Sequence, residues 1–226
     1  MSLTDLLRAD DQELVEHYPN RAEHAADLGV HLVGLVAALV GGGVLFYWAL
    51  AKGGASVAIA TALYALCLMV MLACSATYNL TRPSPARRML RRLDEAAIFL
   101  MIAGSYTPFL VHLYEPPWSA LNIALVWAIA LGGAAGKILA PQISDRAWCI
   151  VYIAFGWLAV ALIGPFATQM PLNVIVLLAA GGLVYTVGVL IYLAHALPFR
   201  RAIWHGFVIV GAGLHFAAVA SGVVFG

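Results

Sequence analysis

Charged residues are scarce in this sequence. Asp, Glu, Lys and Arg make up 10% of its 226 residues, whereas a soluble domain has about 25%. The formal net charge is +1, so the charge balance gives no indication of a nucleic-acid partner. Only three cysteines are present, in apolar segments and without the paired spacing of a zinc finger, which is typical of small buried side chains. These shortages exclude a soluble domain.

Long apolar runs are what the sequence does contain. Its residues are 63% hydrophobic and its mean hydropathy is +0.93. A membrane-spanning helix needs about 20 mostly apolar residues, and seven runs meet or approach that length. We therefore predict an all-α integral membrane protein, a seven-helix bundle of residues 23–226 that follows a polar tail of residues 1–22. The predicted spans are 25–50, 55–79, 94–113, 119–139, 147–164, 172–197 and 202–224.

The positions of Lys and Arg predict how the bundle sits in the membrane. With seven spans, all of these residues except Lys52 fall in the tail or in loops on one side. Because Lys and Arg are enriched in cytoplasmic loops, we expect a cytoplasmic amino terminus and a carboxy terminus outside. An odd number of spans is required for this result. The expected location is the inner (plasma) membrane of a bacterial-type cell, as a multi-pass protein in the lipid bilayer.

Polar residues inside the predicted spans gather at one end. Several are four residues apart, which places them on one face of a helix. They are Glu23, Asp27 and His31 of the first span, Ser75 and Asn79 of the second, Asp94 of the third, and Arg201 and His205 of the seventh. In the predicted orientation, all lie at or just inside the cytoplasmic ends of their spans. Because ionisable groups are costly in hydrocarbon, such a cluster indicates an intramembrane site.

Several of these residues also fit simpler roles. Glu23 and Asp27 are compatible with interfacial carboxylates, which the helix dipole favours near a helix start. Asp94 is compatible with an amino-terminal helix cap or with the ion-pair partner of a nearby arginine. Arg201 fits an ordinary topology-setting charge. For His205 we favour a functional role, because a histidine at that depth needs a partner.

Five stretches of the sequence resemble the haemolysin III family, the bacterial branch of the progestin and adipoQ receptor group. The likeness extends from about residue 21 to the end. The stretches are Glu23-xxx-Asp27-xxx-His31-xx-Gly34, Ser75-Ala-Thr-Tyr78-Asn79, Leu93-Asp94-Glu95-Ala-Ala-Ile-Phe99, Ala103-Gly104-Ser-Tyr106-Thr107-Pro108-Phe109, and Ile203-Trp204-His205-Gly-Phe-Val208 with His215-Phe216. The resemblance implies a seven-helix bundle with a cytoplasmic amino terminus, in agreement with the charge count.

The resemblance also implies a metal site. In better-understood relatives, a zinc ion is held by one histidine at the end of the second span and two histidines, four residues apart, in the seventh. An aspartate at the start of the third span holds a zinc-bound water, and a serine lies nearby. The implied reaction is hydrolysis of a lipid amide such as a ceramide. Carried over by motif, Ser75, Asp94 and His205 are the catalytic candidates, and His205 and Asp94 are the candidate metal ligands.

The sequence departs from the family pattern at three positions. Asn79 stands where the second-span histidine belongs, and Arg201 stands where the first seventh-span histidine belongs. Asparagine is a poor zinc ligand, and arginine, which is always protonated, is none. Glu95 replaces a histidine that is common in bacterial members. The implied three-histidine zinc site is therefore absent.

Three functional hypotheses follow. In the first, the metal is lost, Arg201 pairs with Asp94, and the protein is a membrane sensor, a regulator or a binder of a lipid or sphingolipid-like ligand. In the second, it is a lipid amide hydrolase in which Asp94 and His205, with His31 or Glu23, bind a metal such as zinc, or in which Asp94 and His205 act as an acid–base pair. We favour the first, because a guanidinium at a ligand position repels an incoming cation. The third is a pore-forming cytolysin, as the family name suggests.

Overall fold

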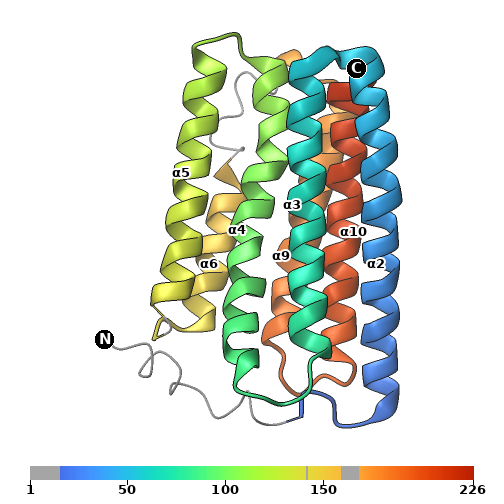
Figure 1. Ribbon diagram of the computed structural model, residues 1–226, viewed down its shortest axis with the longest axis vertical. Coiled ribbons are helices and arrows are strands. Elements are labelled where there is room, and N and C mark those ends of the chain that lie inside the picture. The colour runs from blue at the N-terminus through green and yellow to red at the C-terminus, as the bar shows by residue number, and fades with distance from the viewer. Residues whose placement is uncertain (1–15, 141, 159–167) are drawn as a thin grey trace.

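The described residues form an elongated helical bundle (Figure 1). The computed structural model describes residues 16–140, 142–158 and 168–226, and these residues contain no strand. Nearly all the helices lie close to parallel with the long axis. The elements are α2 (Arg21–Trp48), η2 (Ala49–Gly53), α3 (Gly54–Leu80), α4 (Ala86–Leu113), α5 (Trp118–Leu139), α6 (Asp145–Gly156), α9 (Leu172–Leu193), α10 (Arg200–Val219) and η3 (Ala220–Val224), of which η2 and η3 are π-helical.

Five helical stretches of the described chain are long and apolar enough to cross a membrane. The first, Arg21–Leu80, contains both α2 and α3, which pack against each other side by side (Figure 1). The chain reverses between them at Gly54, whose φ of 73° lies in the left-handed region that glycine adopts without a steric penalty. The prediction of an all-α membrane protein is confirmed.

Two of the sequence predictions fall partly outside the described residues. The predicted fifth span, residues 147–164, begins in α6, but residues 159–167 are not described. The predicted polar tail, residues 1–22, is described only from residue 16.

Helix α4 starts earlier than the predicted third span. It begins at Ala86, directly after Pro85, and carries the arginine-rich segment before Asp94 as helix rather than loop. Asp94 therefore lies about two turns inside the helix. The interpretation of Asp94 as an amino-terminal cap is wrong.

The two faces of α2 differ in polarity. Its buried positions follow the three- and four-residue spacing of one helix face: Asp27, His31, Gly34, Ala38, Gly42 and Leu45. On the opposite face, Val33 is 63% exposed and Leu39 is 68% exposed. Apolar side chains that face outward suit contact with lipid, while the polar and small residues face the other helices. Of the polar stripe predicted on the first span, Asp27 and His31 therefore point into the bundle, whereas Glu23 is not among the buried residues.

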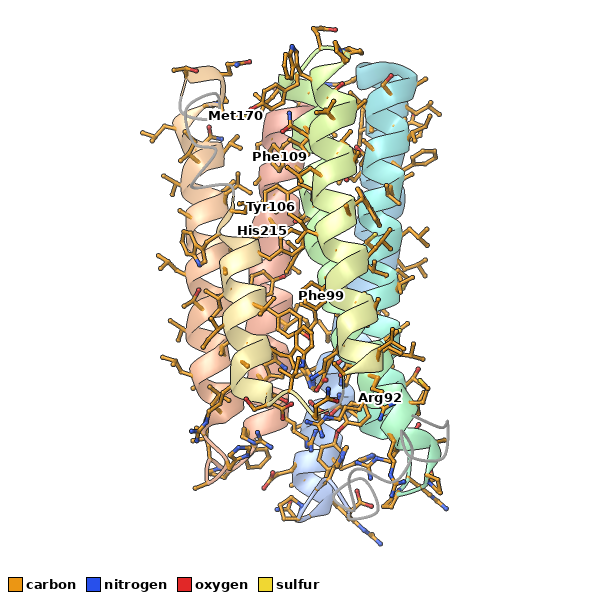
Figure 2. All side chains as sticks on the ribbon, turned by 90° about the vertical axis from the view of Figure 1, so that its left-hand side faces the viewer. Arg92, Phe99, Tyr106, Phe109, Met170 and His215 are labelled. Atoms are coloured by element: carbon orange, nitrogen blue, oxygen red, sulfur yellow. The ribbon has the colours of Figure 1, made fainter. Side chains whose placement is uncertain are left out.

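Phe99 is the centre of a packed apolar region between α4, α5 and α6 (Figure 2). Its side chain is fully buried, with ring centroids 4.7 Å from Tyr152 and 5.9 Å from Trp148. Helix α5 approaches this ring at Gly133, where an added Cβ would lie 2.4 Å from Phe99 Cε1. The neighbouring Gly132 has nothing within 4 Å of such a Cβ.

We expect Gly133→Ala to destabilise the bundle by about 1–3 kcal/mol, because the new methyl group overpacks a ring that cannot move away. Gly132→Ala is the matched control and should be neutral or slightly stabilising, since both substitutions make the same change in helix propensity. Thermal unfolding of the purified proteins in detergent measures the difference. Equal melting temperatures for the two variants would show that α5 does not approach Phe99 at Gly133.

Candidate functional site

Asp27 and His205 form the centre of a polar cluster between α2 and α10. The Asp27 side chain is fully buried. His205 Nδ1 lies 2.6 Å from Asp27 Oδ1, and the hydroxyl of Tyr18 donates to Asp27 Oδ2 at 2.5 Å. Because a carboxylate only accepts, the proton in the first contact belongs to His205 Nδ1. In the neutral ring, Nε2 is then the nitrogen with a free lone pair.

His31 lies against both members of this pair. Its ring centroid is 4.3 Å from that of His205, and its Nε2 is 3.4 Å from Asp27 Oδ2. The four-residue spacing of Asp27 and His31 on α2 brings both side chains to one face, as the sequence predicted.

Ser75 and Asn79, one turn apart on α3, face the other side of the His205 ring. Ser75 Oγ lies 3.4 Å from His205 Nε2, and Asn79 Nδ2 lies 3.5 Å from the same atom. The Asn79 amide also donates to the Ser75 carbonyl oxygen at 3.0 Å. Either contact suits the tautomer set by Asp27, because the one lone pair of an unprotonated ring nitrogen can accept from a hydroxyl or from an amide.

Arg201 is bonded to Asn79 and not to Asp94. Its Nη1 donates to Asn79 Oδ1 at 2.8 Å. Among the ion pairs of the described residues, none joins Arg201 to Asp94, so the pairing expected from sequence is not found. With Oδ1 held by the guanidinium, the Nδ2 of Asn79 is directed toward His205.

A cavity of about 620 Å³ connects this cluster to the interior of the bundle. Side chains of α2, α3, α4, α5, α6, α9 and α10 line it. At its polar end are His31, Ser75, Asn79, Asp94, Arg201 and His205, and farther along are Met71, Ile102, Phe109, Ile175, Leu178 and Val208. Asp94 thus shares a cavity with Ser75 and His205, whereas Glu23 is not among the lining residues. Glu23 instead receives a hydrogen bond from Asn20 at the start of α2, where its backbone N–H also donates to the Asn20 side chain.

Four charged residues at the same end link α4, α5 and α6 and also line the cavity. Arg91 contacts Glu95 Oε1 at 3.1 Å and Asp145 Oδ2 at 2.6 Å, and the Lys137 ammonium contacts Glu95 and, at 3.6 Å, Asp145 Oδ1. Figure 2 shows nitrogen and oxygen atoms crowded at this lower end of the bundle, near Arg92. Sequence reasoning missed this network. The available signals were the four-residue spacing of Arg91 and Glu95 and the presence of Lys137 in the last turn of an apolar helix.

Residues before α2 also reach the cluster. Tyr18 is 7% exposed and bonds Asp27, and the His17 ring packs edge-on against Tyr78 with centroids 5.1 Å apart. Burial, together with the positive charge of Arg201, lowers the pKa of His17 to about 3, so this imidazole is neutral at pH 7. Sequence reasoning placed His17 in a polar tail, because no periodic pattern marks it as a contact of the bundle.

The helices and the buried polar cluster define an all-α membrane protein with a candidate site inside the bundle. The family described as Haemolysin-III related matches residues 25–216, and the chain belongs to this family. It is 32% identical to Hemolysin-3 of Bacillus cereus over 87% of this chain and 90% of that one. It is 27% identical to the Hemolysin-3 homolog of Bacillus subtilis (strain 168), over 87% and 92%. It is 26% identical to the Homo sapiens Monocyte to macrophage differentiation factor, over 89% and 84%. No solved structure matches it significantly.

The zinc site that the family resemblance implies does not fit the residues present. Two of its three histidine positions are Asn79 and Arg201, which are bonded to each other. A guanidinium cannot ligate a metal and repels a cation. The site therefore cannot hold zinc in the arrangement expected from the family.

Asp27, His31 and His205 form a different group with metal-binding side chains. Each offers one ligand atom, and these atoms lie within 4.8 Å of one another; Asp94 is not part of the group. Carboxylate and imidazole are ligands that zinc accepts. Two ligands bound to one zinc at tetrahedral angles stand about 3.3 Å apart, whereas Asp27 and His205 are 2.6 Å apart. In this geometry the two residues share a proton.

Restoring the two histidines should create a zinc site. We expect the double variant Asn79→His, Arg201→His to bind about one zinc per chain, because Asn79 of α3 contacts His205, and Arg201, one turn before His205 on α10, contacts Asn79. Elemental analysis of the purified protein by mass spectrometry measures the metal. The two single variants are the controls and should each bind less, since each still lacks one imidazole. A double variant that holds no more zinc than the wild type would contradict the placement of α3 against α10.

Proposed function

We propose that this protein binds an amphiphilic lipid inside a seven-helix bundle, with the polar part of the lipid at Ser75, Asp94 and His205. The observation that carries this proposal is the cavity itself, whose charged side chains gather at one end and whose remaining lining is mostly apolar and aromatic, with a few uncharged polar groups such as Ser105 and Thr186. Its volume, about 620 Å³, lies within the range of about 300–1,000 Å³ that is usual for ligand pockets. A long-chain lipid has the same division between a polar end and an apolar chain.

The charges at the polar end suit a head group that contains hydroxyl or amide groups. Asp94 and Arg201 both line the cavity, and one Arg201 nitrogen is bonded to Asn79. The guanidinium donates charge-assisted hydrogen bonds, and a carboxyl group can bond a hydroxyl or an amide in either protonation state, so these two residues would fix the polar end of the ligand. The Bacillus relatives are named hemolysins, but the outward face of α2 is apolar, which favours lipid contact over the wall of an aqueous pore.

A second candidate function is hydrolysis of the bound lipid. It is favoured by one specific observation, the approach of Ser75 Oγ to His205 Nε2 at the wall of the cavity. The zinc-dependent form of this reaction does not suit Asn79 and Arg201, so the hydrolysis would have to proceed through residues of the chain.

The proposed seven spans consist of α2, α3, α4, α5, α9 and α10 and a fifth span that begins with α6. In Figure 1 the start of α2 and the end of the chain lie at opposite ends of the bundle, which supports an odd number of crossings. The distribution of Lys and Arg supports a cytoplasmic amino terminus.

Reporter fusions test this topology. Alkaline phosphatase fused after Gly226 should be active, because the enzyme folds only outside the cytoplasm and we expect the carboxy terminus there. The same enzyme inserted between α3 and α4, at Pro83, should be inactive, and a fluorescent protein should give the reverse pattern at both positions. Two inactive fusions would mean that the number of spans is even, whereas an inactive carboxy-terminal fusion with an active Pro83 insertion would mean that the orientation is reversed.

Filling the cavity tests lipid binding. Val208 lines the cavity from α10, whereas Val210 is 56% exposed on the outside of the same helix. We expect Val208→Trp to weaken retention of lipid about tenfold or more, because overpacking costs about 1–3 kcal/mol. Val210→Trp is the matched control and should retain lipid as the wild type does. Native mass spectrometry and extraction of the purified proteins quantify the bound lipid; equal retention in both variants would contradict binding in this cavity.

A further inference from the structure

Three residues from three helices lie in the order of a nucleophile, a base and an orienting acid. Ser75 of α3 approaches His205 Nε2 at 3.4 Å, and Asp27 of α2 contacts His205 Nδ1 at 2.6 Å. We propose that Ser75 is the nucleophile of a metal-independent acyl transfer, with His205 as its general base and Asp27 as the acid that orients His205. This inference rests on the proposed binding of a lipid in the cavity, and it names the substrate as a long-chain carboxylic ester or amide.

The burial of the three residues matches these roles. Ser75 and His205 both line the cavity, whereas Asp27 is fully buried behind His205 and does not line it. The reacting hydroxyl therefore faces the space for the lipid, and the carboxylate is shielded from it. A distance of 3.4 Å is longer than a strong hydrogen bond, but the bond between nucleophile and base is often looser before substrate binds.

Asp27 sets the tautomer that the reaction needs. Because Asp27 accepts from Nδ1, the lone pair of His205 Nε2 points toward Ser75 Oγ. Tyr18 donates to the second carboxylate oxygen at 2.5 Å and so keeps Asp27 from rotating. Tyr18 is thus a positioning residue in this proposal.

Asn79 supplies a donor next to the reacting atoms. Its Nδ2 is 3.0 Å from the Ser75 carbonyl oxygen and 3.5 Å from both Ser75 Oγ and His205 Nε2. One N–H is used by the carbonyl, and the second lies beside the point of attack, where negative charge develops on the substrate oxygen. Arg201 fixes this direction through its bond to Asn79 Oδ1. Asn79 and Arg201, which occupy the positions of two family histidines, would therefore both take part in this reaction, Asn79 as a donor and Arg201 by orienting it.

The reaction is balanced with water as the second reactant. Ser75 Oγ forms a bond to the acyl carbon and passes its proton to His205 Nε2. The C–O or C–N bond of the lipid then breaks, and the leaving alcohol or amine takes that proton. Water attacks the acyl-serine, its proton passes through His205 to Ser75 Oγ, and the free fatty acid is released. No oxidant, reductant or metal is consumed.

A long-chain alkyl fluorophosphonate tests the proposal on the full-length protein in detergent or nanodiscs. This probe reacts with activated serines and needs no knowledge of the lipid. We expect an adduct on the peptide that contains Ser75, formed equally with and without a zinc chelator. Ser75→Ala should abolish it. Asp27→Asn should slow its formation about a hundredfold or more, because the wrong tautomer of His205 is then favoured.

Ser221 of η3 provides the control, since it donates to the Ala217 carbonyl and does not line the cavity. Ser221→Ala should label as the wild type does. If Asp27→Asn fails to fold, as judged by loss of its thermal unfolding transition, His205→Gln replaces it and should likewise slow labelling about a hundredfold or more.

Four results would overturn the inference: no adduct on Ser75, labelling at the wild-type rate in Asp27→Asn, labelling at that rate in a folded His205→Gln, or labelling abolished by a zinc chelator. Native mass spectrometry of bound lipid distinguishes failure of the Ser75 mechanism from failure of the proposed lipid binding. Lipid bound by the wild type and by Ser75→Ala, with no adduct in the wild type, overturns only the nucleophile. A wild-type protein that carries no lipid overturns the proposed binding site.

Discussion

The contact between Asp27 and His205 is the constraint on which the site depends. A carboxylate with no exposed surface inside a membrane bundle is costly unless its oxygens accept hydrogen bonds. Here His205 and Tyr18 supply them from α10 and from the segment before α2. The requirement holds α2 against α10 and fixes the His205 tautomer. It thereby decides what Ser75 and Asn79 on α3 can do.

Much of the cluster could be predicted from spacing within single helices. Asp27 and His31, Ser75 and Asn79, and Arg201 and His205 are each four residues apart, and a four-residue interval places two side chains on one helix face whatever the surroundings. The structure brings all of them together except that Arg201 reaches the cluster only through Asn79. Spacing within a helix could not show, however, which of these residues contact one another across helices. It therefore could not identify Asp27, among several carboxylates, as the partner of His205.

The remaining features depend on how helices from distant parts of the sequence are placed in register. The Arg201–Asn79 bond joins α10 to α3, and the network of Arg91, Glu95, Lys137 and Asp145 joins three helices. Of these contacts, only the one between Arg91 and Glu95, four residues apart on α4, follows a local spacing. The interpretation of Asp94 as a helix cap is wrong for a related reason. The apolar run begins at Asp94, but the helix begins earlier, at Ala86, because helix formation does not need apolar residues.

The bond between Asn79 and Arg201 also bears on how such a site can evolve. If either residue alone became histidine, the other would lose its partner: a guanidinium or an amide oxygen would remain in the bundle without its hydrogen bond, at a cost of about 1–3 kcal/mol or more. Single steps between the histidine pair and the asparagine–arginine pair are therefore disfavoured. We therefore expect the two positions to change together across relatives.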